Sequence, residues 1–294
     1  MSFFLSKLNI IAKNTNTYLK KFFTREKNNS RLLIPMKYGI FSGGKRFRSA
    51  IVVNTGKIYD INYKKLIIIG SAIECMHSYS LIHDDLPSMD NDDLRRGKLS
   101  LHKKFNEFTA ILAGNSLLTA AFEILSGKEL NLSDKYKNDL VKTLALSSGH
   151  TGLAGGQYSD LTFQNKNISK QNIINMQRKK TGELFGFCCE SIGIIKGVNY
   201  NERRKLKELG INIGLLFQTV DDLIDYVGNS TVVGKPTKSD KKKGKATLVN
   251  LMGYQATLLF AEKLKKKINL QIKSYGHRAN DLLDSVEFII KRKF

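Results

Sequence analysis

Apolar residues recur every three or four positions through most of the chain, the spacing that places them on one face of an α-helix. No repeat of solenoid length and no low-complexity linker divides the sequence. The pattern therefore predicts one domain over residues 1–294, with helices at 2–24, 31–40, 46–58, 65–86, 106–126, 135–149, 170–192, 201–226, 246–274 and 278–291. Intervals rich in glycine and charge predict three loops, at 87–104, 150–170 and 227–245.

The amino-acid composition points to the same fold class. Only 3 prolines and no tryptophan occur in 294 residues, while Leu, Ile, Lys, Glu and Ala are used heavily. This usage favours long helices over a β-sandwich or barrel with many turns. Because 41% of the residues are hydrophobic, a sizeable core can form, which excludes an intrinsically disordered chain. We therefore expect an all-α protein.

The chain is strongly basic, with 48 Lys and Arg against 26 Asp and Glu and a net charge of +22. Such a charge would suit a nucleic-acid-binding protein, because a basic surface attracts phosphate. The lysines, however, are scattered among Ile and Asn, as in a genome that has drifted toward A+T-rich codons, and the sequence has no aromatic RNP segment or Arg-Gly repeat. We expect no nucleic-acid partner and keep nucleic-acid binding as the weaker alternative.

Cysteine usage and apolar segments predict the compartment. Cys75, Cys188 and Cys189 form no Cys-x-x-Cys pattern, which fits a reducing, cytoplasmic setting. The N-terminal stretch has no basic region ahead of its apolar residues, and Lys7 interrupts them, so it does not read as a signal peptide. Apolar runs such as 66–69 are far shorter than the ~18 residues of a membrane span. We expect a cytoplasmic protein without a transmembrane segment.

Acidic residues are concentrated in two short segments. Residues 84–93 and 221–225 together hold eight acids, where the chain average predicts about one. Asp221 and Asp225 lie one helical turn apart on the same face, with Gln218 on the preceding turn. Pro87 should end the earlier helix and let Asp90 curl back toward Asp84.

Both clusters should lie near helix C-termini, where the helix dipole disfavours negative charge. Cations must therefore neutralise the two clusters. Carboxylate oxygens on rigid helices suit Mg²⁺, because the ion can use its remaining coordination positions to bind substrate phosphate. The alternative is a solvated acidic loop that pairs internally with Arg95 and Arg96.

Basic groups stand beside these clusters. Residues 43–48 open a helix, a suitable place for an anion, and Lys45 and Arg48 project together. Residues 39–45 match P-loop spacing, but Arg46 replaces the Ser or Thr which that motif needs and no strand precedes it, so we reject a nucleotide site. Further basic or polar groups in or beside the loops are Arg95, Arg96, Lys180, Thr181, Lys235 and Lys245.

Carboxylates suited to Mg²⁺ alternate along the chain with cationic side chains suited to phosphate. In this the sequence resembles the trans-isoprenyl diphosphate synthases, and among them the bacterial farnesyl diphosphate synthases. The matching stretches span nearly the whole chain and lie at 43–48, 77–97, 102–115, 155–160, 180–185, 217–225 and 234–247. The resemblance implies the all-α isoprenoid synthase fold, with helices packed around a deep central cavity, and a homodimer.

The resemblance also implies roles for individual residues. About three Mg²⁺ ions would be held by the acidic clusters, as in other sites that share metal with phosphate, and their ligands would come from Asp84, Asp85, Asp90, Asp221, Asp222 and Asp225. The allylic diphosphate would meet Arg95, Lys180 and Lys235, with Lys245 as a helper. Isopentenyl diphosphate would meet Lys45, Arg48, His77 and Arg96. Lys180 and Lys235 would stabilise the leaving diphosphate, and Thr181 and Gln218 the allylic cation.

The implied reaction is ionisation of dimethylallyl or geranyl diphosphate, attack by isopentenyl diphosphate and loss of a proton. Tyr79 and Ser80, just before the first cluster, would limit the product to farnesyl diphosphate. Geranylgeranyl diphosphate is the alternative product, and simple core packing is the alternative role of Tyr79. Departures from the family pattern occur at Asn115, Ser49 and Asn229; they replace no metal ligand but change the hydrogen bonding around the ligands.

Two other classes of protein share these features in part. A terpene cyclase has no second diphosphate to bind, so Lys45, Arg48 and His77 argue against it. A non-catalytic prenyltransferase subunit should lack one acidic cluster, whereas both are present here.

Overall fold

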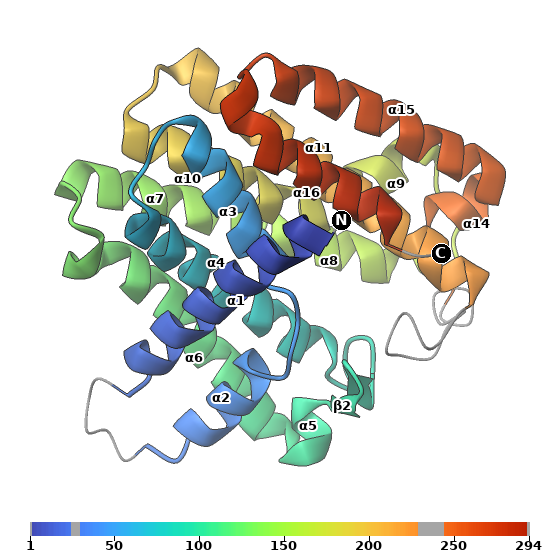
Figure 1. The fold of residues 1–294 in the computed structure, drawn as a ribbon. Helices are drawn as coiled ribbons and strands as arrows, with labels where there is room; N and C mark the ends of the chain where they lie inside the picture. Colours follow the sequence, from blue (N-terminus) through green and yellow to red (C-terminus); the bar gives the residue numbers. More distant parts are fainter. Residues whose placement is uncertain (1, 25–29, 229–243, 293–294) are drawn as a thin grey trace. The chain divides into compact units, whose positions relative to one another are not determined.

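The computed structural model describes residues 2–24, 30–228 and 244–292. Within these ranges the chain is helical apart from one two-stranded hairpin, so the predicted all-α class is confirmed (Figure 1). The elements are α1 (Ser2–Phe22), α2 (Leu33–Ile40), α3 (Phe47–Ile58), α4 (Tyr63–Asp84), β1 (Leu94–Arg95), β2 (Lys98–Leu99), α5 (Leu101–Lys104), α6 (Glu107–Ser126), the 3₁₀ turn η1 (Lys128–Leu130), α7 (Asp134–Ser148), α8 (Leu153–Thr162), α9 (Lys170–Gln177), the π-helical turn η2 (Arg178–Gly182), α10 (Glu183–Lys196), α11 (Tyr200–Val227), α14 (Leu248–Met252), α15 (Tyr254–Lys273), the 3₁₀ turn η3 (His277–Ala279) and α16 (Asn280–Lys291).

The contacts divide the chain into two compact units. The N-terminal unit comprises residues 2–53 and 62–141, and the C-terminal unit comprises 54–61 and the described residues from 142 onward. Helices α3 and α7 each contribute residues to both. A single domain over 1–294 stays a prediction, and each unit is described by itself.

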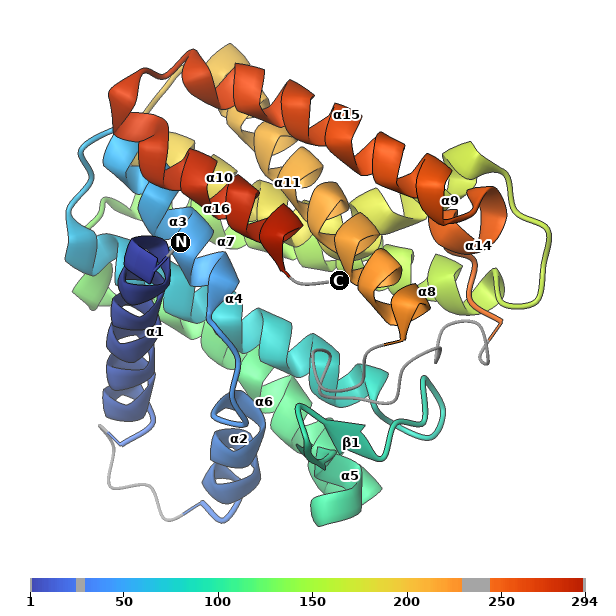
Figure 2. The same ribbon diagram turned by 45° about the vertical axis from the view of Figure 1, so that its right-hand side comes forward.

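Helix α4 forms the core of the N-terminal unit. Its side chains are buried on all faces over most of its length, and Ile68, Ile69 and Ile73 are fully buried. It packs against α6, which runs beside it, and against α1 and α2 (Figure 2). Asn62 begins the helix by accepting a hydrogen bond from the backbone N–H of Lys64. A rigid, buried helix thus carries the first acidic cluster at its C-terminal end.

Helices α10 and α11 form the core of the C-terminal unit, and glycines allow their close approach. A Cβ atom on Gly210 would lie 2.2 Å from the carbonyl oxygen of Phe185, and one on Gly214 would lie 2.8 Å from the Cα atom of Gly182. Asn199 caps α11 by accepting from the backbone N–H of Glu202. Helices α15 and α16 pack on α11.

Four of the predicted segments differ from the structure. The predicted loop 87–104 contains the β1–β2 hairpin and the short helix α5. The predicted loop 150–170 contains helix α8, because Gly155 and Gly156, which suggested a loop, lie inside a helix. The predicted helix 246–274 breaks at Gly253, whose φ of +80° interrupts the helical backbone between α14 and α15. The predicted helix 170–192 is interrupted by η2.

Two helices of the described chain, α4 and α6, are long and apolar enough to cross a membrane by length and composition alone. The most apolar window of α4 is 78% buried inside the protein and that of α6 is 44% buried. Because a core helix passes the same test, this is weak evidence for a span.

Candidate active-site groups

Residues 43–48, which we name the anion-binding segment, form the turn that leads into α3. Gly43 and Gly44 have φ values of +112° and +103°, which residues with side chains rarely adopt. Lys45 is exposed and Arg48 is partly buried, whereas Arg46, with φ of +50°, is buried. The prediction that this segment opens a helix is confirmed, since α3 begins at Phe47.

Arg96 holds the outer side of the anion-binding segment. One of its guanidinium nitrogens, Nη1, donates a hydrogen bond to the carbonyl oxygen of Gly43. A Cβ atom on Gly44 would lie 2.6 Å from the Cζ atom of Arg96, so a side chain there would displace the Arg96 guanidinium from its present position. Arg96 and the segment, which the family resemblance groups as ligands of one diphosphate, therefore lie together.

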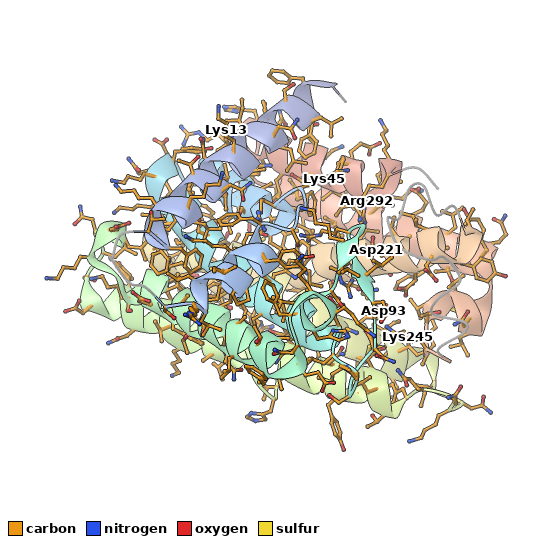
Figure 3. All side chains as sticks on the ribbon, turned by 90° about the horizontal axis from the view of Figure 1, so that it is seen from below. Lys13, Lys45, Asp93, Asp221, Lys245 and Arg292 are labelled. Carbon is orange, nitrogen blue, oxygen red and sulfur yellow. The ribbon has the colours of Figure 1, made fainter. Side chains whose placement is uncertain are left out.

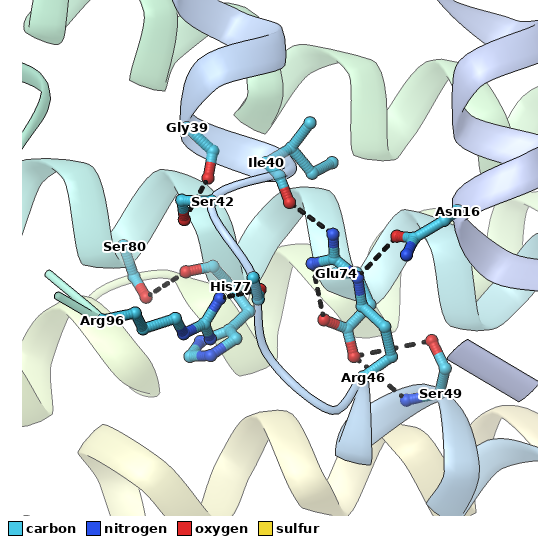
Figure 4. Close-up of polar contacts among 11 residues, drawn as sticks. Asn16, Gly39, Ile40, Ser42, Arg46, Ser49, Glu74, His77, Ser80 and Arg96 are labelled. Carbon is cyan, nitrogen blue, oxygen red and sulfur yellow. Dashed lines mark hydrogen bonds and ion pairs between the residues drawn. The ribbon is translucent and has the colours of Figure 1, made fainter. Parts of the chain in front are cut away.

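His77 lies on α4 among these cations, and Figure 4 shows its ring beside the Arg96 side chain. Burial, and then the positive charges of Arg48 and Arg96, hold the pKa of His77 well below its usual range; Arg46 and Arg95 act in the same direction. The imidazole is therefore neutral near pH 7 and can still donate one N–H hydrogen bond to an anion.

The first acidic cluster curls back on the end of α4, as Pro87 predicts. The backbone N–H of Asp90 donates to the carbonyl oxygen of Asp84 at 2.9 Å, and that of Asp92 donates to Asp85 at 3.2 Å. The turn thus brings the backbone of Asp90 next to Asp84, and both side chains are partly exposed.

Asp85 differs from the other acids of this cluster by its burial, and it pairs with Arg95. Arg95 Nε lies 2.9 Å from Asp85 Oδ1, and Arg95 Nη2 lies 3.4 Å from Asp92 Oδ2. Burial raises the pKa of the Asp85 carboxyl, and the Arg95 guanidinium opposes this shift. The internal pairing weighed from the sequence is therefore present for Arg95, whereas Arg96 binds the anion-binding segment instead.

Tyr79 and Ser80 occupy α4 one turn before the cluster. The Tyr79 ring packs edge-to-face on His83, with 4.7 Å between ring centroids, and His83 Nε2 lies 3.1 Å from the carbonyl oxygen of Ile111 on α6. Ser80 is buried and donates to the carbonyl oxygen of His77 at 2.9 Å. His83, which the sequence did not single out, therefore fixes the Tyr79 ring.

In the C-terminal unit, Lys180 and Thr181 lie in the π-helical turn η2. Such turns contain one extra residue, which redirects side chains, and they are frequent at functional sites. Lys180 Nζ lies 2.6 Å from Asp160 Oδ2 on α8. A Cβ atom on Gly156 would lie 2.1 Å from the backbone nitrogen of Lys180, so this glycine lets α8 approach the turn. The glycines of 155–160 and the lysine of 180–185 thus belong to one local structure.

The second acidic cluster is part of a hydrogen-bonded chain of side chains. Thr181 Oγ1 donates to Gln218 Oε1 at 2.9 Å, and Gln218 Nε2 donates to Asp222 Oδ1 at 2.8 Å. The other oxygen of Asp222 accepts from Gln177 Nε2 at 2.7 Å. Asp222 is 3% exposed, so its carboxylate is held in one orientation. The spacing predicted that Gln218 shares a helix face with Asp221 and Asp225. In the structure its side chain donates to Asp222.

The other two carboxylates of this cluster differ in exposure. Asp225 is buried, whereas the Asp221 side chain is 41% exposed and Asp221 Oδ1 lies 2.7 Å from Arg292 Nη1 (Figure 3). The Arg292 guanidinium also lies over the Phe217 ring, 4.0 Å from its centroid. The sequence did not single out Arg292.

Of the remaining predicted cations, the structure describes Lys245. Lys245 precedes α14, and its carbonyl oxygen accepts from the Asn250 side chain at 3.0 Å. Lys235 and Asn229 lie outside the described residues. Asn115 lies on the exposed face of α6, and Ser49 is buried in the first turn of α3.

The carboxylates fit Mg²⁺ by their chemistry. Among the described residues, no three His, Cys, Asp or Glu side chains are gathered closely enough to hold a metal ion on their own. Mg²⁺ commonly takes only one or two protein carboxylates and completes its octahedron with water and substrate phosphates. Partly exposed carboxylates at Asp84, Asp90 and Asp221 suit that arrangement.

Comparisons with known proteins decide the family. The family model described as polyprenyl synthetase matches residues 29–284. The chain belongs to this family. It is 38% identical to a farnesyl diphosphate synthase from Micrococcus luteus over 264 residues, 90% of each chain. It is 35% identical to a farnesyl diphosphate synthase from Escherichia coli, covering 98% of this chain and 99% of that one.

Solved structures agree with this assignment. An FPP/GFPP synthase from Zymomonas mobilis has a TM-score of 0.84 and 34% identity, covering 97% of this chain and 99% of that one. A Helicobacter pylori geranyltransferase complexed with magnesium and isoprenyl diphosphate has a TM-score of 0.81 and 29% identity, covering 96% of each. The resemblance inferred from the motifs is therefore confirmed, and with it the isoprenoid synthase fold class.

Besides His83 and Arg292, sequence reasoning missed two residues that hold predicted site residues in place. Asp160 pairs with Lys180, and its membership of the matching stretch 155–160 could have drawn attention to it. Gln177 holds Asp222 from 45 residues away, and no local pattern signals that contact.

Proposed function

We propose that this chain is a Mg²⁺-dependent prenyltransferase. It condenses isopentenyl diphosphate with dimethylallyl diphosphate and then with geranyl diphosphate, giving (2E,6E)-farnesyl diphosphate and diphosphate. The observation that carries this proposal is the basic group formed by the anion-binding segment, Arg96 and neutral His77, which is present in addition to the acidic cluster at the end of α4. An enzyme with one diphosphate substrate has no need of this second cationic group. The names of the relatives support the same reaction.

In the proposed reaction, the bond between C1 and oxygen of the allylic substrate breaks and diphosphate leaves with the electron pair. The isopentenyl double bond attacks C1, and loss of a proton forms the new double bond. Asp84, Asp90, Asp221 and Asp225 would hold Mg²⁺, with Asp85 and Asp222 as supporting carboxylates. About three ions would supply positive charge to the departing diphosphate, as in other metal-assisted transfers.

The chain's own residues bind and orient the substrates. Lys45, Arg48 and Arg96 would neutralise the isopentenyl diphosphate, and His77 would donate a hydrogen bond without adding a charge. Lys180 is aimed by Asp160, and together with Lys235, Arg95 and Lys245 it would bind the allylic diphosphate.

Thr181 and Gln218 are the proposed stabilisers of the allylic cation. Their hydroxyl and amide dipoles are fixed by the hydrogen bonds to each other and to Asp222. Fixed dipoles favour a developing charge without reorganising during the reaction.

Product length is proposed to depend on Tyr79 with Ser80. The support is that His83 holds the Tyr79 ring on α4, one turn before the carboxylates. Geranylgeranyl diphosphate is the weaker alternative, since it would need this ring to yield to a longer chain.

A homodimer in the cytoplasm is the proposed state. Helix α6 exposes Phe108, Ile111 and Leu112 on one face, and their exposed fractions are 66%, 41% and 49%. An exposed apolar face of this kind commonly marks an interface, and a second copy of the chain would cover it.

The test is incubation of the purified protein with isopentenyl diphosphate, dimethylallyl or geranyl diphosphate and Mg²⁺, with products separated by chain length. We expect a C15 product that disappears on addition of chelator and in Asp84→Asn. The exposed Asp284→Asn on α16 is the matched control and should retain activity. A folded protein without product would favour a non-catalytic subunit, and nucleic-acid binding that survives Asp84→Asn would favour the other alternative.

A further inference from the structure

One residue of the anion-binding segment points into the protein interior. Arg46 is 3% exposed, and its guanidinium contacts three elements of the N-terminal unit (Figure 4). Its Nε donates to Asn16 Oδ1 on α1 at 2.9 Å, its Nη2 donates to the carbonyl oxygen of Ile40 on α2, and its Nη1 lies 3.5 Å from Glu74 Oε2 on α4. The left-handed backbone at Arg46 directs this side chain inward, while its neighbours Lys45 and Arg48 remain at or near the surface.

Glu74 is the partner that joins this segment to α4. Its side chain is also buried, at 2% exposure, and its second oxygen, Oε1, accepts from the backbone N–H of Ser49 at 3.2 Å and from Ser49 Oγ at 3.5 Å. Ser49 lies in the first turn of α3, which has no acidic residue of its own. One carboxylate therefore neutralises a buried guanidinium and satisfies an N-terminal N–H group of α3.

These contacts hold the anion-binding segment at its middle and just after its C-terminal end. Arg46 holds the middle of the segment, and Ser49 holds the start of α3, which follows the segment. Both residues contact the carboxylate of Glu74. Glu74 lies one turn before His77 on α4, so it sets the segment relative to that imidazole. Gly70 assists, because a Cβ atom there would lie 2.8 Å from Ser49 Oγ.

We propose that Glu74 is a positioning residue for isopentenyl diphosphate: through Arg46 and Ser49 it sets the direction in which Lys45 and Arg48 present their charges, without touching the substrate. This inference rests on the proposed function. The proposal predicts a change in the affinity for isopentenyl diphosphate that is opposite in sign to the change expected from electrostatics alone. Removing a negative charge should strengthen binding of an anion through the field alone, whereas loss of positioning weakens it.

The first experiment measures steady-state kinetics of Glu74→Gln with each substrate varied separately. We expect the KM for isopentenyl diphosphate to rise about tenfold, while the KM for geranyl diphosphate stays within about twofold. The matched control is Glu190→Gln in the C-terminal unit, which removes the negative charge that pairs with Arg203 (2.8 Å) and should lower stability without a selective change in KM. A lowered or unchanged KM for isopentenyl diphosphate in Glu74→Gln, or an equal rise in the control, would overturn the proposal.

A double variant separates positioning from stability. Replacing a buried ion pair by apolar residues often restores stability, so Arg46→Met with Glu74→Met should recover thermal stability. Because the directional contacts are gone, the KM for isopentenyl diphosphate should remain raised. A KM that returns to the wild-type value together with the melting temperature would show that the pair has only a structural role.

Ser49→Pro provides a test that leaves the Arg46–Glu74 pair intact, should Glu74→Gln not fold. Proline lacks the N–H that Ser49 donates, so one tether of the segment is lost, and we expect a rise of about threefold in the same KM. No rise would contradict the proposal. A wild-type protein that forms no product would instead contradict the proposed function, so the two failures are distinguishable.

Discussion

Asp160 Oδ2 lies 2.6 Å from Lys180 Nζ and joins helix α8 to the π-helical turn η2. The Asp160 side chain is 7% exposed and that of Lys180 is 23% exposed, so the ammonium group is held in place while remaining accessible. This pairing explains why a lysine in an irregular helical turn can point in one direction.

Asp160→Asn should therefore lower kcat without a large loss in the free energy of unfolding. We expect a fall of about tenfold in kcat, because Lys180 loses the carboxylate that orients its ammonium group for the diphosphate that it is proposed to bind. Steady-state kinetics with saturating substrates measures this, and Asp134→Asn, at a 94% exposed side chain, is the control. An unchanged kcat would show that Lys180 does not need this partner.

Gln177→Ala should destabilise the protein by about 1–3 kcal/mol, because Asp222 would lose a hydrogen bond while its carboxylate stays buried. Urea denaturation measures the change. The exposed Gln171→Ala on α9 should cost less than about 0.5 kcal/mol. Equal costs in the two variants would argue that water replaces the Gln177 amide at Asp222.

Tyr79→Ala should lengthen the product. Removing the ring that packs on His83 would open space one turn before the carboxylates, so C20 should appear beside or in place of C15. Product chromatography decides this, with Tyr158→Ala as the control because that ring is 72% exposed on α8. A pure C15 product from Tyr79→Ala would assign the ring to core packing.

His77 should make stability depend on pH in the acidic range. Its pKa in the folded protein lies well below the ordinary 6.5, through burial and the neighbouring arginines, so the unfolded chain takes up the proton first. The stabilisation is therefore complete above about pH 6.5 and is lost progressively as the pH falls below that value.

The measurement is the free energy of unfolding at pH 7.5 and pH 5. His77→Gln should lose less stability between these values than the wild type, whereas exposed His150→Gln should follow the wild type. Identical losses in all three proteins would remove His77 as the cause.

Local patterns predicted most of the helices because burial on one face imposes a three-to-four residue spacing. The turn that brings the backbone of Asp90 onto Asp84 was predictable from Pro87, because proline constrains the backbone of its immediate neighbours. Helix α8 was missed because Gly155 and Gly156 suggested a break in the helix. In the structure Gly156 lies within α8, and its lack of a side chain leaves room for the backbone of Lys180.

The sequence by itself determined the helical class, the family and the two acid-rich segments, because periodicity, motif order and local charge density are properties of neighbouring residues. Only the tertiary structure decided how individual charges are used. Asp85 pairs with Arg95, Asp222 binds Gln177, and Glu74 binds the inward-turned Arg46. Most of these partners are separated by tens of residues, and it is packing of the helices, through burial and close approach, that selects them among the many charges of a +22 chain.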